Sequence, residues 1–199
     1  LTVVSQDTFY STNAVECSAE VVIEITAEDI CNGVSTNLVT RVVIDGVDVA
    51  TGTGTMTYRG TYGLGTHSLI VTTRDACDNT ATFTQEFIVA DGKAPTPIVH
   101  EDLIAELGKI EDGEAEAQVW ANDFIASSIY DCTGQDATDV DGNGNAKITK
   151  YSINVVGDSV DMDQVGLLFS CAEAQQEVDV EIHAWDEAGN HDYVVTSVL

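Results

Sequence analysis

The sequence predicts an all-β protein made of two tandem immunoglobulin-like β-sandwich domains, and three observations lead to this prediction. Short runs alternate apolar and polar residues, as in residues 21–27, 40–44 and 177–182. An alternation with a period of two is typical of strands that bury one face. Turn signals such as Asp45-Gly46 separate these runs. Part of the strand-and-turn pattern also occurs twice along the chain.

The repeat relates residues 67–83 to the segment that begins at residue 179, with an offset of 111 residues. Four pairs carry the match: Leu69 with Val180, Val71 with Ile182, Asp75 with Asp186, and Asn79 with Asn190. A weaker match sets residues 25–29 against residues 119–123. Two copies of one plan predict two similar domains, and about seven strands in each half favour a sandwich. A single larger barrel is the alternative, which the repeat disfavours.

The predicted domains span residues 1–91 and 92–199, with a linker near residues 91–97. Both prolines of the chain, Pro95 and Pro97, lie in that linker. Because proline fixes φ, we expect the linker to be short and stiff rather than a loose hinge.

Within the first domain, the strand at 40–44 is expected to form a hairpin with a strand that begins at residue 47. In the second, the strand at 177–182 precedes a last strand near the C-terminal end of the sequence. Residues 103–107 and 123–130 are the candidates for short helical turns, because Gly113 interrupts the run of Glu and Ala between them.

The charge of the chain excludes several classes of partner. Acidic residues number 34 and basic residues 7, which gives a net charge of -27. Binding to nucleic acid or to an anionic membrane surface needs basic residues that are scarce here. No run reaches the roughly 18 apolar residues of a membrane helix, so we expect no membrane insertion. The sequence does not begin with Met and carries no signal peptide, which we interpret as a mature product or a segment of a longer chain.

Five cysteines are spread along the chain without a C-x-x-C motif, which argues against zinc or a redox dithiol. In an immunoglobulin-like sandwich, the loops near residues 28–31 and 75–79 meet at one end, so Cys31–Cys77 is the first predicted disulfide. Cys132 and Cys171 pair by elimination. Cys17 is then left as a buried thiol or a bridge to another chain.

The strongest candidate for a metal site is the segment 139–145, which follows the D-x-D-x-N-G start of a calcium loop. Asp139, Asp141 and Asn143 supply side-chain oxygens at the first, third and fifth positions, and Asn145 supplies a carbonyl at the seventh. Lys150 stands where the loop expects a bidentate Glu, so Asp136 is the nearest replacement, with Asp158, Asp161 and Asp163 farther along the chain. The alternative is a hairpin turn in which the same residues form local hydrogen bonds.

Two further acidic clusters are predicted at the loop ends of the domains. The first contains Glu28, Asp29, Asp75 and Asp78, and the second contains Asp123, Asp131, Asp186, Glu187 and Asn190. Neighbouring carboxylates repel each other unless a cation joins them, so Ca²⁺ is the expected cofactor here as well. The alternative is that these Asp and Asn residues only build turns.

Trp120 and Trp185 fall out of phase with the apolar residues of their strands, so both are expected to point outward. An exposed indole can stack on a sugar ring or pack against another subunit, although a sandwich edge or the linker can also cover it. Enzyme signatures such as G-x-S-x-G and H-E-x-x-H are absent from the sequence, and we expect no enzymatic activity. His67, His183 and His191 are expected to be surface or turn residues.

Several motifs resemble a known family. The turns D-x-C-x-N at 75–79 and D-x-x-G-N at 186–190, together with the D-G-K-A-P-T-P linker, resemble repeats of very large secreted proteins of Bacteroidetes. Those proteins contain hyalin-repeat-like and immunoglobulin-like domains and include gliding-motility-type adhesins exported by type IX secretion. The family often has a cysteine in the linker and another just after the prolines, where this chain has Gly92 and Val99.

The resemblance implies a secreted or cell-surface location and an extracellular adhesive or structural role. We therefore expect part of a stalk, fibre or filament, stiffened by calcium and disulfides, whose partners are copies of itself or neighbouring repeats of a longer chain. The alternative is a carbohydrate-binding module that presents its Trp residues to a surface polysaccharide.

Overall fold

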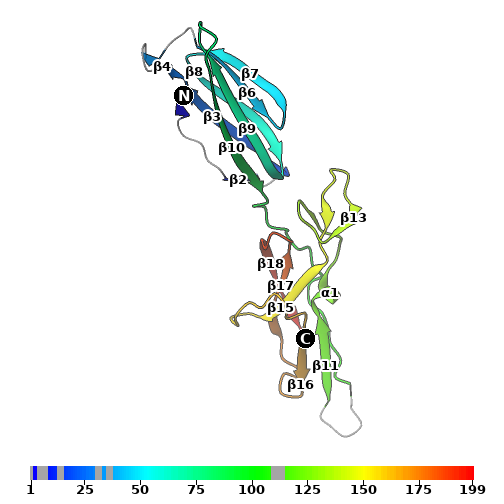
Figure 1. The fold of residues 1–199 in the computed structure, drawn as a ribbon. Coiled ribbons are helices and arrows are strands. Elements are labelled where there is room, and N and C mark those ends of the chain that lie inside the picture. The colour runs from blue at the N-terminus through cyan, green and yellow to red at the C-terminus, as the bar shows by residue number, and fades with distance from the viewer. Residues whose placement is uncertain (1, 4–8, 13–15, 30–32, 35–37, 109–114) are drawn as a thin grey trace. The chain divides into compact units, whose positions relative to one another are not determined.

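The computed structural model of the chain describes residues 2–3, 9–12, 16–29, 33–34, 38–108 and 115–199. The chain divides into two compact units, Leu1–Gly92 and Lys93–Leu199, each with its own sheets (Figure 1).

The first unit places two sheets around one core. The three-stranded sheet has the order β1-β3-β8, and the five-stranded sheet has the order β2-β10-β9-β6-β7. Strand β2 pairs with β10 in parallel, and the other strands of these two sheets pair antiparallel. A short pair, β4-β5, lies between β3 and β6 in the sequence. The strands are β1 (Thr2–Val3), β2 (Phe9–Ser11), β3 (Ser18–Thr26), β4 (Glu28–Asp29), β5 (Gly33–Val34), β6 (Val39–Ile44), β7 (Val47–Thr53), β8 (Thr55–Gly63), β9 (Gly65–Arg74) and β10 (Thr80–Ala90).

Alternation along β3 shows why this unit is a sandwich. Val21, Ile23 and Ile25 are at most 1% exposed, whereas the residues between them, Val22 and Glu24, lie on the other face of the strand and are less buried. The three buried residues pack with apolar residues of β6, β9 and β10 from the opposite sheet. Burying one face of each sheet removes apolar surface from water, which is the main force holding the layers together.

The second unit has a three-stranded sheet β15-β17-β18, a two-stranded sheet β11-β16 and a small sheet β12-β14-β13. A parallel bridge joins Leu103 to Val198, as β2 joins β10 in the first unit. The elements are β11 (Glu116–Trp120), α1 (Ala121–Phe124), β12 (Tyr130–Asp131), β13 (Asp136–Val140), β14 (Ala146–Lys147), β15 (Lys150–Val155), β16 (Gly166–Ser170), β17 (Val178–Trp185) and β18 (His191–Val198).

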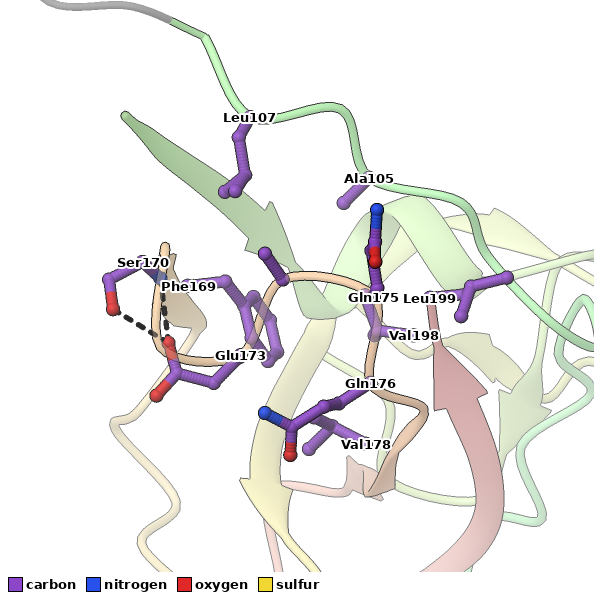
Figure 2. A pocket seen from close by; sticks show the side chains of 11 residues that line it. Ala105, Leu107, Phe169, Ser170, Glu173, Gln175, Gln176, Val178, Val198 and Leu199 are labelled. Atoms are coloured by element: carbon purple, nitrogen blue, oxygen red, sulfur yellow. Dashed lines mark hydrogen bonds between the residues drawn. The ribbon is translucent and has the colours of Figure 1, made fainter. Parts of the chain in front are cut away.

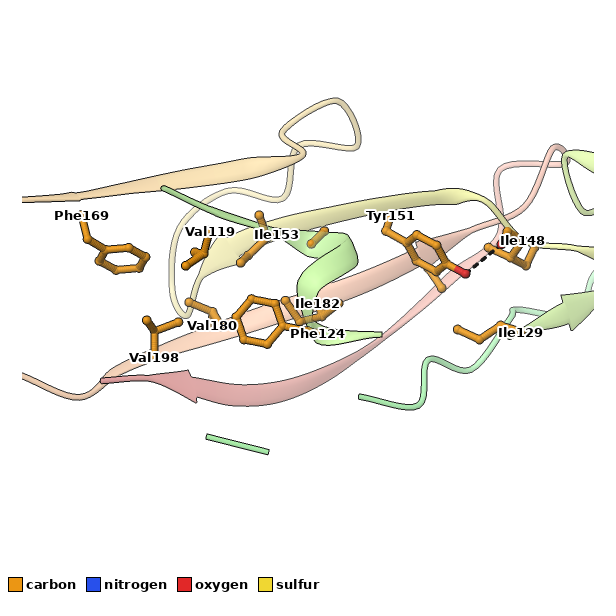
Figure 3. Close-up of a cluster of buried hydrophobic side chains, with 12 residues drawn as sticks. Val119, Phe124, Ile129, Ile148, Tyr151, Ile153, Phe169, Val180, Ile182 and Val198 are labelled. Atoms are coloured by element: carbon orange, nitrogen blue, oxygen red, sulfur yellow. Dashed lines mark hydrogen bonds between the residues drawn. The ribbon is translucent and has the colours of Figure 1, made fainter. Parts of the chain in front are cut away.

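Strands and helix share the core of the second unit (Figure 3). Phe124 of α1 is fully buried beside Val119, Ile153 and Ile182. Tyr151 reaches the same cluster, and its hydroxyl donates a hydrogen bond to the Ile148 carbonyl at 2.8 Å. The core therefore closes without a long helix.

The repeat seen in the sequence corresponds to two matching hairpins, β9-β10 and β17-β18. Leu69 and Val71 are at most 1% exposed on β9, and their counterparts Val180 and Ile182 are fully buried on β17. The predicted all-β fold of two immunoglobulin-like sandwiches is confirmed. The helical expectations were only partly right. Residues 121–124 form a single turn, whereas residues 103–107 are not helical, because Leu103 and Ala105 donate backbone hydrogen bonds to Ser197 and Leu199.

Candidate functional site

The loop between β17 and β18 is built around the carboxylate of Asp186. Its Oδ1 accepts a hydrogen bond from the Asn190 backbone N–H at 2.7 Å, and its Oδ2 accepts one from Asn190 Nδ2 at 2.7 Å. The backbone N–H of Asp186 in turn donates to the Asn190 carbonyl at 3.0 Å. One aspartate thus closes a five-residue loop.

Two other loops repeat this arrangement. Asp75 accepts hydrogen bonds from the backbone N–H and Nδ2 of Asn79 at 2.8 and 2.7 Å, and Asp141 accepts them from Asn145 at 2.9 and 2.9 Å. The Asn79 side chain is the main cause that lowers the pKa of Asp75, and the Asn145 N–H is the main cause that lowers the pKa of Asp141. These carboxylates are therefore stabilised as anions by donors of their own turn.

The fourth residue of each loop has a positive φ: 69° at Asp78, 85° at Gly144 and 89° at Gly189. This left-handed conformation is favourable for glycine and tolerated by Asp or Asn. It explains the D-x-x-G-N pattern at two of the three loops. At the third, Asp78 holds the position and its carboxylate also pairs with Arg74, with Nη2 and Oδ1 2.5 Å apart.

The predicted calcium loop at 139–145 contains the second of these turns. Asp139 pairs through Oδ2 with Lys147 Nζ at 2.8 Å and accepts a hydrogen bond from the Tyr130 hydroxyl at 3.1 Å. The Lys147 ammonium is the main cause that lowers the pKa of Asp139. Asn143 contributes its backbone N–H to Asp141 at 2.8 Å. These bonds are those of the hairpin turn, the alternative to a calcium loop at this segment. Calcium binding here stays a prediction.

Other predicted ligands also have partners nearby. Asp136 accepts hydrogen bonds from the N–H and hydroxyl of Thr138, and the hydroxyl is the main cause of its lowered pKa. Asp123 accepts the Trp120 N–H at 2.9 Å, so it caps α1. Asp131 is fully buried and pairs with Lys93. The side chain of Asp29 lies outside the described residues.

Both predicted disulfides are wrong. Cys77 and Cys171 are free and exposed, whereas Cys132 is disulfide-bonded. Cys17, which the sequence analysis left without a partner in the chain, is also disulfide-bonded. Cys31 lies outside the described residues. The error has a physical cause: the loop at 75–79 closes through Asp75 and Asn79, and this turn leaves the Cys77 thiol at the surface.

Trp120 is exposed as predicted, with 44% of its surface accessible. It lies opposite Gly166 in the β11-β16 pair, and a Cβ on that glycine would meet the indole at 3.0 Å. The indole therefore covers the glycine on the outer face of the sheet. Leu168, two residues along that face, is 62% exposed.

The prediction that Trp185 points into solvent is wrong, because Trp185 is only 8% exposed. Its Nε1 donates a hydrogen bond to the Ser152 hydroxyl at 2.9 Å, and its ring stacks on His191 with centroids 4.0 Å apart. Trp185 does lie on the strand face opposite the core, as its strand phase indicates, but other side chains cover that face.

His183 belongs to the same group of rings and is not a surface residue, since it is 1% exposed. Its ring lies 5.1 Å from Tyr193 and 5.4 Å from His191, measured between centroids. Burial is the main cause that lowers the pKa of His183. Its Nδ1 has no hydrogen-bond partner among the described residues. The alternation along β17 marked His183 as off the core face and so gave no signal of its burial.

A cavity of about 210 Å³ lies in the second unit between the turn after β16 and the end of β18 (Figure 2). Leu107, Phe169 and Val198 make its walls largely apolar. Glu173 is the titratable residue among its lining, and the Ser170 backbone N–H and hydroxyl both donate to its Oε2 at 2.8 Å. The Ser170 N–H is the main cause that lowers the pKa of Glu173. This cavity suits an apolar group rather than a charged substrate.

Neither a family model nor a curated protein matches this sequence. The solved structures that are similar to this chain include the following three. Fibronectin(III)-like modules of Clostridium thermocellum CbhA share 9% identity, with a TM-score of 0.36, over 100% of this chain and 92% of theirs. SGBP-B of the Bacteroides ovatus mixed-linkage glucan utilization locus, solved with a mixed-linkage heptasaccharide, shares 14% identity, with a TM-score of 0.31. There the match covers 96% of this chain and 42% of the other.

The N-terminal Ig1-2 module of the Drosophila receptor protein tyrosine phosphatase DLAR shares 11% identity, with a TM-score of 0.30, over 99% of this chain and 96% of that one. In the part of the chain that the structure describes, no helix is long and apolar enough to cross a membrane.

Proposed function

We propose that this chain is an extracellular, non-enzymatic structural or adhesive module that forms part of a surface stalk, fibre or filament. The observation that carries the proposal is that each unit encloses its own hydrophobic core, and that the two clusters have no member in common among the described residues. Two self-contained sandwiches in succession suit a mechanical role, because each resists unfolding separately. Acidic loops whose carboxylates accept hydrogen bonds from their own turns add rigidity rather than reactivity.

The disulfide-bonded cysteines support an extracellular location, and the charge and sheet edges bear on how copies would associate. Cys17 and Cys132 are disulfide-bonded, and disulfides persist mainly in oxidising compartments such as the cell surface. A net charge of -27 keeps neighbouring molecules soluble and apart. Association with further copies would use sheet edges, and β7 ends the five-stranded sheet of the first unit. Calcium would further stiffen the acidic loops.

Force spectroscopy tests the mechanical role. The chain is placed between two reference domains of known unfolding force and pulled at constant speed in a reductant, because a disulfide at Cys17 or Cys132 would shield the residues that it encloses from the force. We expect two unfolding events besides those of the references, one for each sandwich. Smooth extension without separate events contradicts the proposal. Unfolding of both units at forces within the noise of the measurement contradicts it as well.

A second candidate function is carbohydrate binding, which the exposure of Trp120 favours. Its indole lies over Gly166 and offers an exposed apolar surface beside Leu168. Stacking of such a ring against a sugar is tested on a glycan array with Trp120→Ala. Ile104→Ala is the matched control, since Ile104 is 73% exposed elsewhere in the same unit. Binding lost in the first variant and kept in the second supports a glycan site, and absence of binding by the unmodified chain contradicts it.

A further inference from the structure

Lys93 and Asp131 form an unusual ion pair within the second unit. Lys93 Nζ lies 2.9 Å from Asp131 Oδ1, and the Asp131 side chain is 0% exposed. Two other lysine–aspartate pairs of the described residues have carboxylates open to water: Asp139 is 42% exposed beside Lys147, and Asp163 is 80% exposed beside Lys150. The pair at Asp131 is therefore the one that water solvates least.

The carboxyl group of Asp131 is also held in place by the backbone. The Cys132 N–H donates a hydrogen bond to the same Oδ1 at 2.7 Å. A donor at this oxygen draws electron density from Cγ and makes that carbon more susceptible to attack by a nitrogen. The ammonium nitrogen of Lys93 is positioned next to it, as covalent reactions between two side chains require.

We propose that Lys93 and Asp131 become joined by an intramolecular amide bond. The Lys93 ammonium first gives a proton to Oδ2 of Asp131. The neutral amine then forms a bond from Nζ to Cγ, and the bond between Cγ and the protonated Oδ2 breaks. The two protons that the ammonium group loses leave with Oδ2 as one water molecule, so an ammonium and a carboxylate give a neutral amide and water. Nothing is oxidised or reduced, and no further reactant is consumed.

Formation of the amide would remove the desolvation penalty of the buried ion pair. Charges buried away from water carry a large desolvation penalty, and their mutual attraction only partly offsets it. The amide removes both charges, while Oδ1 remains as its carbonyl oxygen and keeps the hydrogen bond from the Cys132 N–H. The bond would tie residue 93, where the second unit begins, to β12. It goes beyond the proposed mechanical function and does not depend on it.

Mass spectrometry of the intact, reduced and alkylated chain tests this proposal. We expect a mass lower than that of the sequence by one water molecule. We also expect a branched peptide, after proteolysis, that contains both Lys93 and Asp131. This peptide is decisive for the unmodified protein, so the test does not require any variant to fold.

Two variants separate the amide from other losses of water. Lys93→Arg keeps a positive charge but is too strongly protonated to attack a carboxyl group, so we expect the full mass. Lys147→Arg, at an exposed pair, should still lack one water. A full mass, without loss of water, for the chain that carries no substitution overturns the proposal. Loss of water that persists in Lys93→Arg also overturns it, because cyclisation at a step such as Asp45-Gly46 removes the same mass.

Discussion

Asp186 and Asn190 are joined by three hydrogen bonds, two to the carboxylate of Asp186 and one from its backbone N–H, at 2.7, 2.7 and 3.0 Å. Asp186 is 4% exposed, so its carboxylate is mostly withdrawn from water and depends on these donors. A buried acceptor that loses its donors, or a donor that loses its acceptor, is expensive. The aspartate is thus the organising residue of the β17-β18 loop.

Replacing that residue should destabilise the second unit. We expect Asp186→Ala to lower the free energy of unfolding by about 2 kcal/mol, because the N–H and amide of Asn190 lose their acceptor. Glu187→Ala, one residue along the same loop, is the control, since the Glu187 side chain is exposed. Urea denaturation followed by fluorescence measures both. Equal stability of the two variants would contradict the assigned role.

The glycine at the fourth position of the loop at 141–145 should be sensitive to substitution. Gly144 has a φ of 85°, so we expect Gly144→Ala to cost about 1 kcal/mol through the left-handed backbone. Gly142 lies in the same loop without a positive φ and with open space around its Cβ position. We therefore expect Gly142→Ala to change stability little. The comparison fails if thermal melting ranks the two variants in the opposite order.

Burial of His183 predicts a loss of stability in mild acid. The pKa of His183 is lowered in the folded state, chiefly by desolvation, so the folded protein binds this proton less readily than the unfolded chain. Stability should fall as the pH drops below about 6.5, the ordinary pKa of histidine, and continue to fall until the folded pKa is reached. Denaturation between pH 8 and about 5 measures the slope.

Two variants test whether His183 causes this pH dependence of stability. His183→Phe fills the same stack of rings without a titratable group and should reduce the loss of stability between pH 8 and about 5. His100→Gln should leave it unchanged, because His100 is exposed. A loss of stability in acid that is as large in His183→Phe as in the chain without substitutions means that another group binds the proton.

The pKa of His67 is raised in the folded state, because its hydrogen bonds to Asp45 and Gly63 outweigh burial, so His67 adds stability as the pH falls and contributes equally in both variants. The carboxylates with lowered pKa values, such as Asp75 and Asp141, act in a lower pH window.

Calcium binding at 139–145 has a specific competitor in Lys147, which pairs with Asp139. We expect millimolar Ca²⁺ to raise the melting temperature above that in EDTA. The shift should be larger in Lys147→Gln, because the neighbouring carboxylates then lack their cation. Arg41→Gln is the control, since Arg41 pairs with Asp48 in the first unit. Coincident melting curves in Ca²⁺ and EDTA, for both the unmodified chain and Lys147→Gln, contradict the prediction.

Alkylation without reduction should separate the cysteines. Cys77 and Cys171 are free and exposed, so we expect both to react with iodoacetamide in the folded protein. Cys17 and Cys132 should react only after reduction and unfolding, because both are disulfide-bonded. Peptide mapping reads out each site. Labelling of Cys132 in the unreduced protein, or protection of Cys77, would contradict the assignment.

The sequence by itself determined the strands, the repeat and the turns, because each depends on residues close together in the chain. The period of two along β3 and the Asp–Asn spacing of the loops are local patterns, and local geometry was enough to interpret them. The exposure of Trp120 followed from the same alternation. The pairing of Asp75 with Asn79 agrees with the predicted turn, although Asp75 was also predicted as a calcium ligand.

Only the tertiary structure decided which side chains from distant segments meet. Trp185 is off the core face, as its strand phase indicated, yet Ser152 and His191 cover it. The state of each cysteine and the pairing of Lys93 with Asp131, 38 residues apart, likewise depend on the path of the chain. Strand periodicity records which side of a strand a residue occupies. Strand periodicity does not indicate which side chains from other segments cover that side.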